Sequence, residues 1–180
     1  MYGTEQVITQ RECRVIEIPD GTPMELPAGT SVRIAQALGD TYTLVTPRGQ
    51  MVRLDARDAD VIGKEPPAAP AEGDGSPLEE QVWGQLRTCF DPEIPVNIVD
   101  LGLIYDCGLS DPDDAGQRQA HVKMTLTAPG CGMGQVLADD VKRKVERLPG
   151  IAAAEVEVVF DPPWNPNMMT EAAKLQLGMF

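Results

Sequence analysis

The sequence predicts an α+β protein built from two unlike domains that a linker separates. Three observations predict it. Short β-type runs with frequent turns fill residues 1–62, a Pro-, Gly- and Ala-rich stretch occupies residues 63–77, and helical and strand periods alternate over residues 78–180. We expect a small β-barrel domain first, which could be SH3-like. After the linker we expect a two-layer domain with the element order αββαβα.

Turn residues divide the first 62 residues into short strands. Apolar runs at 15–18, 24–26, 32–34, 42–45 and 51–54 alternate with Pro-Asp-Gly, Pro-Ala-Gly, Gly-Asp and Pro-Arg-Gly turns. Turn signals that recur about every 8–12 residues are typical of a small sandwich or barrel. Residues 63–77 then supply almost nothing to a core, and their prolines favour an extended, semi-stiff spacer.

The third segment, 78–180, carries the mixed pattern. Apolar residues at helical spacing predict helices at 78–86, 136–148 and about 168–177. Strands are predicted at 101–109, 120–127 and 154–160, and the first two should pair as a hairpin across the polar loop 111–116. We therefore expect helices packed on a three-stranded sheet.

Composition narrows the function classes. The net charge is −13, and residues 66–180 carry 18 acidic against 8 basic side chains. This charge opposes binding to a phosphate backbone, so we expect no nucleic-acid partner. No apolar run approaches the roughly 20 residues that span a bilayer, and the N-terminus does not read as a secretory signal. The four cysteines form no C-x-x-C pair, so we expect a reduced, cytoplasmic protein.

The stretch around Cys131 is the most informative part of the chain. A predicted strand ends, Pro129 and Gly130 form a turn, and a helix is predicted to begin at about Met133. Cys131 should therefore lie near a helix N-terminus, where unpaired N–H groups and the helix dipole favour a thiolate. Gly130 and Gly132 leave room around the sulfur for a metal, a cluster or a partner thiol. A buried structural cysteine in a glycine-rich turn is the alternative.

Nucleophilic catalysis is a further alternative for Cys131. A Cys–His pair would need His121, which is the chain's one histidine and lies on the polar face of the strand 120–127. The register of that strand places His121 several residues back from the strand end, at about 3.3 Å per residue. The spacing disfavours a catalytic dyad.

Two other stretches could lie beside Cys131. Asp91 and Glu93 flank Pro92 in a segment typical of a capped turn, and they could instead line the cleft as weak oxygen ligands. Trp164 stands in a stiff proline-rich loop before the last helix. It could cap the core, wall the cysteine pocket or anchor a partner.

These stretches together resemble the SufT-like branch of the metal–sulfur cluster biosynthesis family, which has PaaD-like relatives. The resemblance runs from about residue 78 to 180, through Asp-Pro-Glu-Ile at 91–94, Leu-Gly-Leu-Ile at 101–104, 127–133 and Pro-Pro-Trp at 162–164. The first domain and linker look like the extension that separates this branch from single-domain relatives. The resemblance implies the αββαβα fold and a role in iron–sulfur cluster assembly. It also implies that Cys131 is the reactive cysteine, with Asp91, Glu93 and Thr127 as pocket neighbours.

Ligand number limits how a cluster could be held. A cluster normally takes about four thiolate-type ligands, whereas this pocket offers Cys131 and, at most, Cys89. We therefore expect a non-enzymatic carrier with a transient cluster, held alone, shared in a homodimer or completed by an apo client protein. No permanent cofactor is expected. Partners would be iron–sulfur assembly proteins and clients. A cysteine-dependent thiol transferase and a non-catalytic adaptor are the alternatives.

Overall fold

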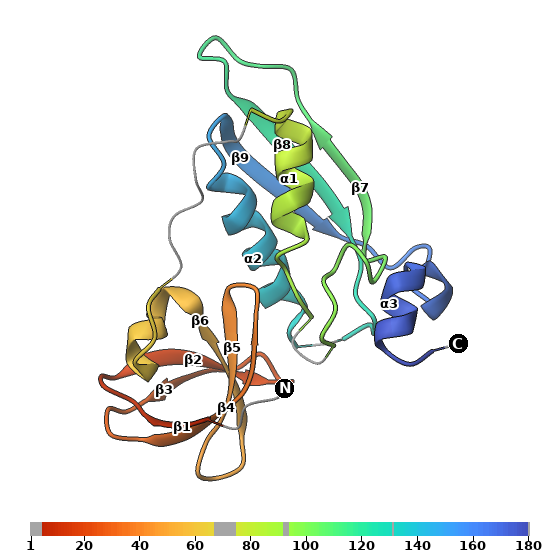
Figure 1. Cartoon of the computed structure of the whole chain (residues 1–180). Helices are drawn as coiled ribbons and strands as arrows, with labels where there is room; N and C mark the ends of the chain where they lie inside the picture. Colours follow the sequence, from red (N-terminus) through yellow and green to blue (C-terminus); the bar gives the residue numbers. More distant parts are fainter. Residues whose placement is uncertain (1–4, 67–74, 92–93, 131, 180) are drawn as a thin grey trace. The chain divides into compact units, whose positions relative to one another are not determined.

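A computed structural model describes residues 5–66, 75–91, 94–130 and 132–179. The chain divides into two compact units, Met1–Ala69 and Pro70–Phe180 (Figure 1). Each unit has its own hydrophobic core. The predicted linker boundaries, 63 and 77, stay a prediction, because residues 67–74 lie outside the described residues. Gly63 and Lys64 still bond back to the first unit, at Asp60 and Ala59.

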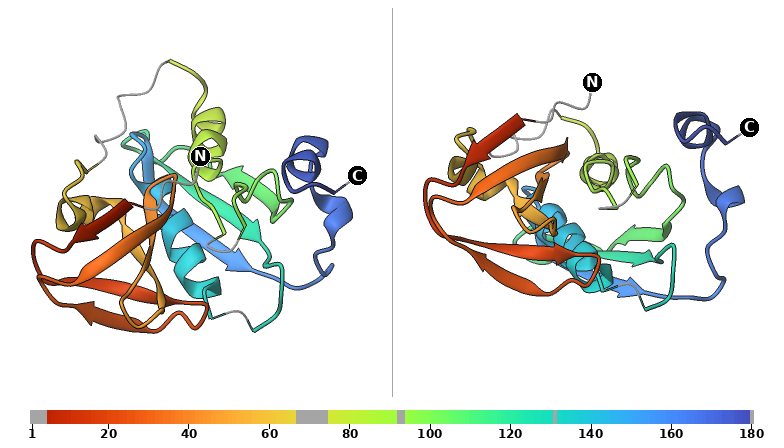
Figure 2. Two further views of the ribbon diagram at one scale, coloured as in Figure 1. Left: turned by 60° about the horizontal axis from the view of Figure 1, so that its bottom comes forward. Right: turned by 90° about the horizontal axis from the view of Figure 1, so that it is seen from below.

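The first unit is a curved antiparallel sheet of six strands. Its strands are β1 (Glu5–Ile8), β2 (Cys13–Ile18), β3 (Pro23–Leu26), β4 (Ser31–Leu38), β5 (Thr41–Val45) and β6 (Met51–Asp55), followed by the 3₁₀ helix η1 (Ala56–Ile62). They pair in the order β1-β4-β5-β6-β2-β3. This order has two ends among the described residues, so the predicted barrel, SH3-like or otherwise, is not confirmed. The curvature of the sheet is visible in Figure 2.

The second unit has the expected αββαβα order. It contains α1 (Leu78–Leu86), β7 (Ile104–Leu109), β8 (Arg118–Met124), α2 (Gly134–Glu146), β9 (Ile151–Val158), the 3₁₀ turn η2 (Pro166–Met168) and α3 (Glu171–Gln176). The sheet order is β7-β8-β9, with β7 and β8 antiparallel and β8 and β9 parallel. The predicted hairpin is therefore confirmed, and the protein is a mixed α+β protein.

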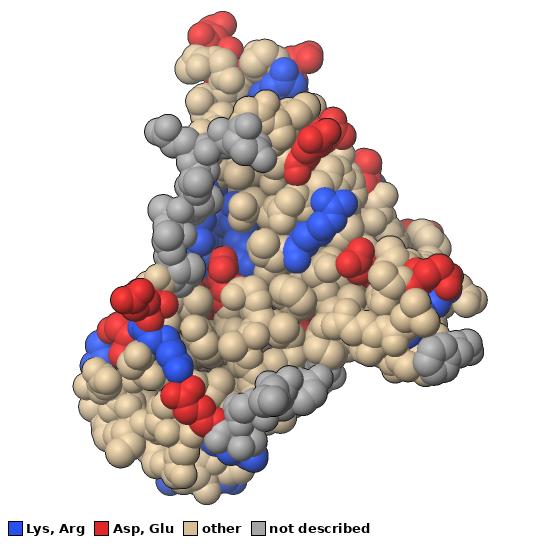
Figure 3. All heavy atoms as spheres, in the orientation of Figure 1, with Lys and Arg blue, Asp and Glu red and all other residues tan. Residues whose placement is uncertain are grey.

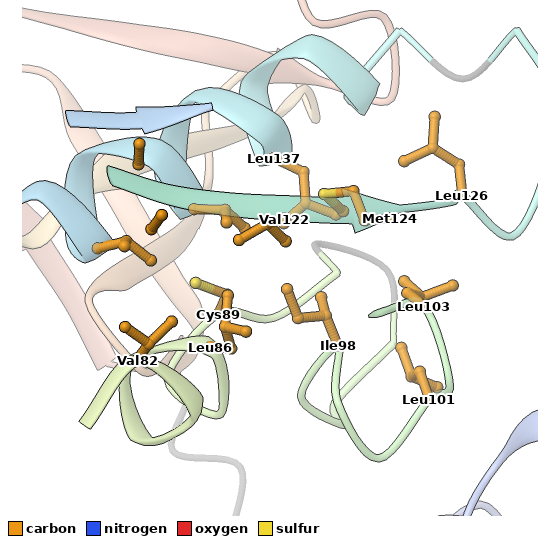
Figure 4. Packing of buried hydrophobic residues seen from close by; sticks show 14 of the residues in the cluster. Val82, Leu86, Cys89, Ile98, Leu101, Leu103, Val122, Met124, Leu126 and Leu137 are labelled. Atoms are coloured by element: carbon orange, nitrogen blue, oxygen red, sulfur yellow. The ribbon is translucent and has the colours of Figure 1, made fainter. Parts of the chain in front are cut away.

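The core of the second unit lies between the sheet and the helices α1 and α2. On β8, Ala120, Val122 and Met124 are buried, while His121 and Lys123 on the opposite face are exposed. Val82 and Leu86 from α1 meet this buried face, together with Leu137 from α2 (Figure 4). Helices cover only one face of β8, and this explains why apolar and polar residues alternate along it.

Several predicted boundaries differ from the structure. The predicted strand 154–160 is shifted to Ile151–Val158. The predicted strand 101–109 begins only at Ile104, because Gly102 has a φ of +76°, which ends any extended run. The predicted strand 120–127 ends at Met124. The last predicted helix, 168–177, is broken into η2 and α3 because Met169 is extended and the Thr170 side chain caps a new helix at the Ala173 N–H.

Candidate functional site

A chain of backbone hydrogen bonds links the loops that the sequence singled out. The Ile98 N–H donates to the Cys89 carbonyl at 2.9 Å, and the Leu103 N–H donates to the Ile98 carbonyl at 3.0 Å. The Thr125 N–H then donates to the Leu103 carbonyl at 2.8 Å. These bonds place the loop that follows α1 beside the loop that follows β8. Both loops therefore lie at the same end of the second unit.

The loop after β8 leads from Thr125 to the start of α2. Leu126 is buried, and Gly134 packs so closely on it that a Cβ at position 134 would overlap the leucine side chain. Between these two points the described residues 128–130 and 132 are exposed. The contact of Leu126 with Gly134 holds the two ends of the loop together, and the exposed residues 128–130 and 132 lie between them. Cys131 itself lies outside the described residues.

Helix α2 begins without a side-chain cap. Its N-cap residue is Met133, which offers no hydrogen-bond acceptor to the first turn. The first N–H groups of a helix and its dipole favour a negative charge when no side chain satisfies them. The predicted helix start at about Met133 agrees with the observed start at Gly134. The uncapped start of α2 is therefore consistent with the prediction that a thiolate is favoured near this point.

Thr125 is a feature of this loop that the sequence did not reveal. Its side chain is fully buried, and its hydroxyl oxygen has no hydrogen-bond partner among the described residues. Alternation placed Thr125 and Thr127 together on the polar face of one strand, but that strand ends at Met124. Thr125 turns inward as a result, and Thr127 is half-buried. The end of the strand could not be read from alternation alone.

Asp91 is at the head of the loop that follows α1. The bridge between Phe90 and Asn97 closes the base of this loop, and Asp91 is half-buried beyond it. Its carbonyl accepts the Ile94 N–H at 3.3 Å, as a turn requires. Glu93 lies outside the described residues. The proposal that these two carboxylates neighbour Cys131 therefore stays a proposal.

Trp164 joins the third predicted stretch to the same end of the molecule. It is half-buried against the core, and its indole Nε1–H donates to the Leu101 carbonyl at 2.7 Å. The Thr170 N–H also donates to the Asp100 carbonyl at 2.9 Å. Gly102 lies so close to Met168 that a side chain there would overlap the Met168 backbone. The proline-rich loop is thus fixed to the segment 97–103, as a cap on the core.

The other cysteines are held in unreactive surroundings. Cys89 is buried in the core beside Leu86 (Figure 4) and donates to the Gln85 carbonyl at 3.6 Å. Burial raises the pKa of Cys107 to about 11, with further contributions from Glu79 and Asp106. Burial also raises the pKa of Cys13, which belongs to the first unit. Cys89 is therefore a core residue, and the suggestion that it could supply a second ligand is not supported.

His121 is on the exposed face of β8. Its Nδ1 lies 3.3 Å from a carboxylate oxygen of Glu155 on the neighbouring strand.

Within the described residues, no three His, Cys, Asp or Glu side chains gather closely enough to hold a metal ion. None of the described helices is long and apolar enough to cross a membrane. On the face drawn in Figure 3, Lys and Arg side chains form no continuous basic surface.

Comparison with known proteins identifies the second unit. The model of the family described as "Iron-sulfur cluster assembly protein" matches residues 79–158. An Fe-S protein maturation auxiliary factor of Porphyromonas gingivalis is 44% identical over 100 residues, which cover 56% of this chain and 90% of that protein. The chain belongs to the iron–sulfur cluster assembly protein family.

Two further relatives place it within that family. The Fe-S protein maturation auxiliary factor YitW of Bacillus subtilis is 40% identical over 57% of this chain and 95% of its own length. The corresponding factor SufT of Staphylococcus aureus is 43% identical over 50% of this chain and 97% of its own length. The resemblance to the SufT-like branch is therefore confirmed. The three relatives match between 50% and 57% of the chain.

A solved structure supports the fold assignment of this family member. The domain of unknown function DUF59 from Bacillus anthracis is 36% identical and has a TM-score of 0.50. The match covers 57% of this chain and 93% of that one. The family's matched region, 79–158, lies wholly within the second unit and contains the loop from Thr125 to Gly134.

Proposed function

We propose that this chain is a non-enzymatic factor in the maturation of iron–sulfur proteins, and that it contacts the cluster transiently through Cys131. Family membership carries this proposal, because the chain covers 90% or more of three relatives named as Fe-S protein maturation auxiliary factors. Its partners would be iron–sulfur assembly proteins and apo client proteins in the cytoplasm.

The geometry of the described residues supports Cys131 as the contact. The described residues 128–130 and 132 of the loop 127–133 are exposed, and α2 begins after them without a side-chain cap. The described thiols of Cys13, Cys89 and Cys107 are partly or wholly buried. Asp91, Glu93, Thr127, Gly130, Gly132 and Trp164 are proposed as its pocket neighbours.

One thiolate per chain cannot complete a cluster that takes about four ligands. A cluster bound by this protein alone should therefore bridge two chains through their 127–133 loops, with carboxylates or solvent in the remaining positions. Mixed ligation of this kind should be labile, so that a client with four cysteines can remove the cluster. An incomplete ligand set thus suits a carrier better than a permanent holder.

Anaerobic reconstitution with iron and sulfide tests this function. The wild type should gain the visible absorbance of a cluster, and light scattering should show two chains per cluster. The absorbance should be lost in Cys131→Ser and retained in Cys107→Ser, which removes a half-buried thiol on β7. The bound cluster should pass to an apo acceptor with four cysteines. A stable cluster on monomeric Cys131→Ser protein would overturn both the bridging arrangement and the role of this cysteine.

A further inference from the structure

Strand β9 forms an open edge of the sheet in the second unit. In the order β7-β8-β9 it pairs with β8 and with no other strand among the described residues. A strand at an edge directs the N–H and C=O groups of alternate residues away from its single neighbour. Such groups are a template for pairing with a further strand.

Two hydrogen bonds show which residues of β9 face outward. The Val159 N–H donates to the Met124 carbonyl at 2.8 Å, so Val159 faces β8. The Ala154 N–H donates instead to a Glu146 carboxylate oxygen on α2 at 3.1 Å, so Ala154 faces the open edge. By alternation, Val156 and Val158 also direct their backbone groups outward. The outward face therefore runs from the Ala154 carbonyl to the Val158 N–H.

A groove lies beside this part of β9. It has a volume of about 440 Å³ and lies between β8, β9 and one side of α2. Its lining combines small or apolar residues with polar ones, namely Ala120, Ala138, Ala153, Ala154 and Val156 with Gln119, Gln135, Asp139, Lys142 and Glu155. Val156 and Val158 point to the helix side of the sheet but are only half-buried. A strand added here would therefore find room, and every second side chain would lie beside Val156 or Val158.

The charges beside the groove favour a basic occupant. Glu155 and Glu157 are exposed on the other face of β9, and each lies next to a basic residue of β8, namely His121 and Lys123. An added strand would lie on the side of β9 away from β8, and its side chains would be cross-strand neighbours of these glutamates. Basic residues are favoured in such positions.

A second copy of this chain fits the edge poorly. Antiparallel pairing of β9 with its own copy would bring Glu155 and Glu157 close to their counterparts, and like charges across a strand pair are unfavourable. Each chain also carries a net charge of −13. The electrostatics therefore favour a different molecule over self-pairing.

We propose that the open edge of β9 and its groove bind an extended segment of a partner protein, in which lysine or arginine alternates with small apolar residues. The segment adds as a fourth strand beside β9. Its basic residues face Glu155 and Glu157, and its apolar residues lie beside Val156 and Val158.

A labelled peptide tests the proposal on the full chain. The probe is a nine-residue fluorescein-labelled peptide in which lysine alternates with valine, and its counterpart carries glutamate in place of lysine. The lysine peptide should raise the fluorescence anisotropy on binding, and it should slow amide exchange at Val156 and Val158. Val156→Pro removes an outward N–H but no bond to β8, so it should weaken binding about tenfold or more.

A matched pair of charge reversals separates the edge from the net charge. Glu155→Lys should weaken the lysine peptide about fivefold and favour the glutamate peptide. Asp114→Lys makes the same charge change in the exposed loop between β7 and β8 and should have little effect. Equal losses in both variants would overturn the proposal, because they would show binding to the overall charge. Protection of Val156 in a self-associated wild type without peptide would overturn it too, by showing a second copy on this edge.

Discussion

At the scale of single residues, the surroundings of the four thiols differ in kind. Cys13 and Cys89 are buried, and Cys107 is half-buried in a strand with its pKa raised to about 11. A thiol reacts as its thiolate, so a raised pKa slows alkylation at neutral pH. The loop that contains Cys131 is exposed on both sides of that residue, at Gly130 and Gly132.

We therefore expect Cys131 to be alkylated first in the folded protein. At pH 7 to 8, mass spectrometry after timed exposure to iodoacetamide should show Cys131 labelled well before Cys13, Cys89 and Cys107. Labelling of Cys107 should increase only as the pH rises toward about 11, because its thiolate is scarce below its pKa. Unfolding in denaturant should remove the differences. Earlier labelling of Cys13 or Cys107 in the folded state would contradict the activated cysteine.

Gly102 offers a second test at this scale. Gly102 and Gly116 share a φ of +76°, but a side chain at Gly102 would overlap the Met168 backbone, whereas nothing lies near Gly116. Gly116→Ala should cost only about 1–2 kcal/mol, the price of a left-handed conformation. Gly102→Ala should cost about 1–3 kcal/mol more, because a packed backbone must move.

Chemical denaturation of both glycine variants measures this difference. Limited proteolysis should also cut the segment 160–179 faster in Gly102→Ala, since that segment is fixed to residues 97–103 through Trp164 and Thr170. Equal stabilities of the two variants would show that the contact with Met168 does not hold this segment.

At the scale of elements, a buried lysine connects α1 and α2 in the second unit. The Lys144 ammonium on α2 donates to the Thr88 carbonyl at 2.7 Å and lies 3.3 Å from the Thr88 hydroxyl. Thr88 follows Arg87, the C-cap of α1, and so lies near the helix C-terminus, where a cation is favoured. Lys144 thus fixes the start of the loop that leads to Asp91.

Lys144→Met should lower the free energy of unfolding by about 1–3 kcal/mol, because a buried carbonyl loses a charged donor. Lys142→Met is the matched control on the same helix, at an exposed position, and should change stability by about 0.5 kcal/mol or less. Urea denaturation gives both values. A Lys144→Met protein as stable as the control would mean that the methionine packing fully replaces this bond.

At the scale of the whole molecule, each compact unit has its own core. Ser76 and Pro77 are the described residues that lead into α1, and both bond to Gln81 at its first turn. We expect a fragment of residues 76–180 to fold alone. It should give a mixed α/β circular dichroism spectrum and a cooperative thermal transition. A fragment that aggregates or melts without cooperativity would show that the first unit completes its core.

Several features could be predicted from the sequence alone because they depend on local chemistry. The element order αββαβα follows from periods of 3.6 and 2 residues. The start of α2 follows from the Pro-Gly turn, and the iron–sulfur assembly family follows from motifs at 91–94, 101–104, 127–133 and 162–164. Each of these signals lies within a few neighbouring residues.

Other features were decided only in three dimensions. The sheet order of the first unit depends on which strands pair across distant turns, so a run of short strands did not establish a barrel. Thr125 is buried because β8 ends at Met124, directly before it, and not at residue 127 as predicted. Cys89 left the candidate site because its side chain points into the core. The backbone bonds from Cys89 to Thr125 join residues that are far apart in sequence. The open edge of β9 follows from which strands pair. No local pattern encodes either feature.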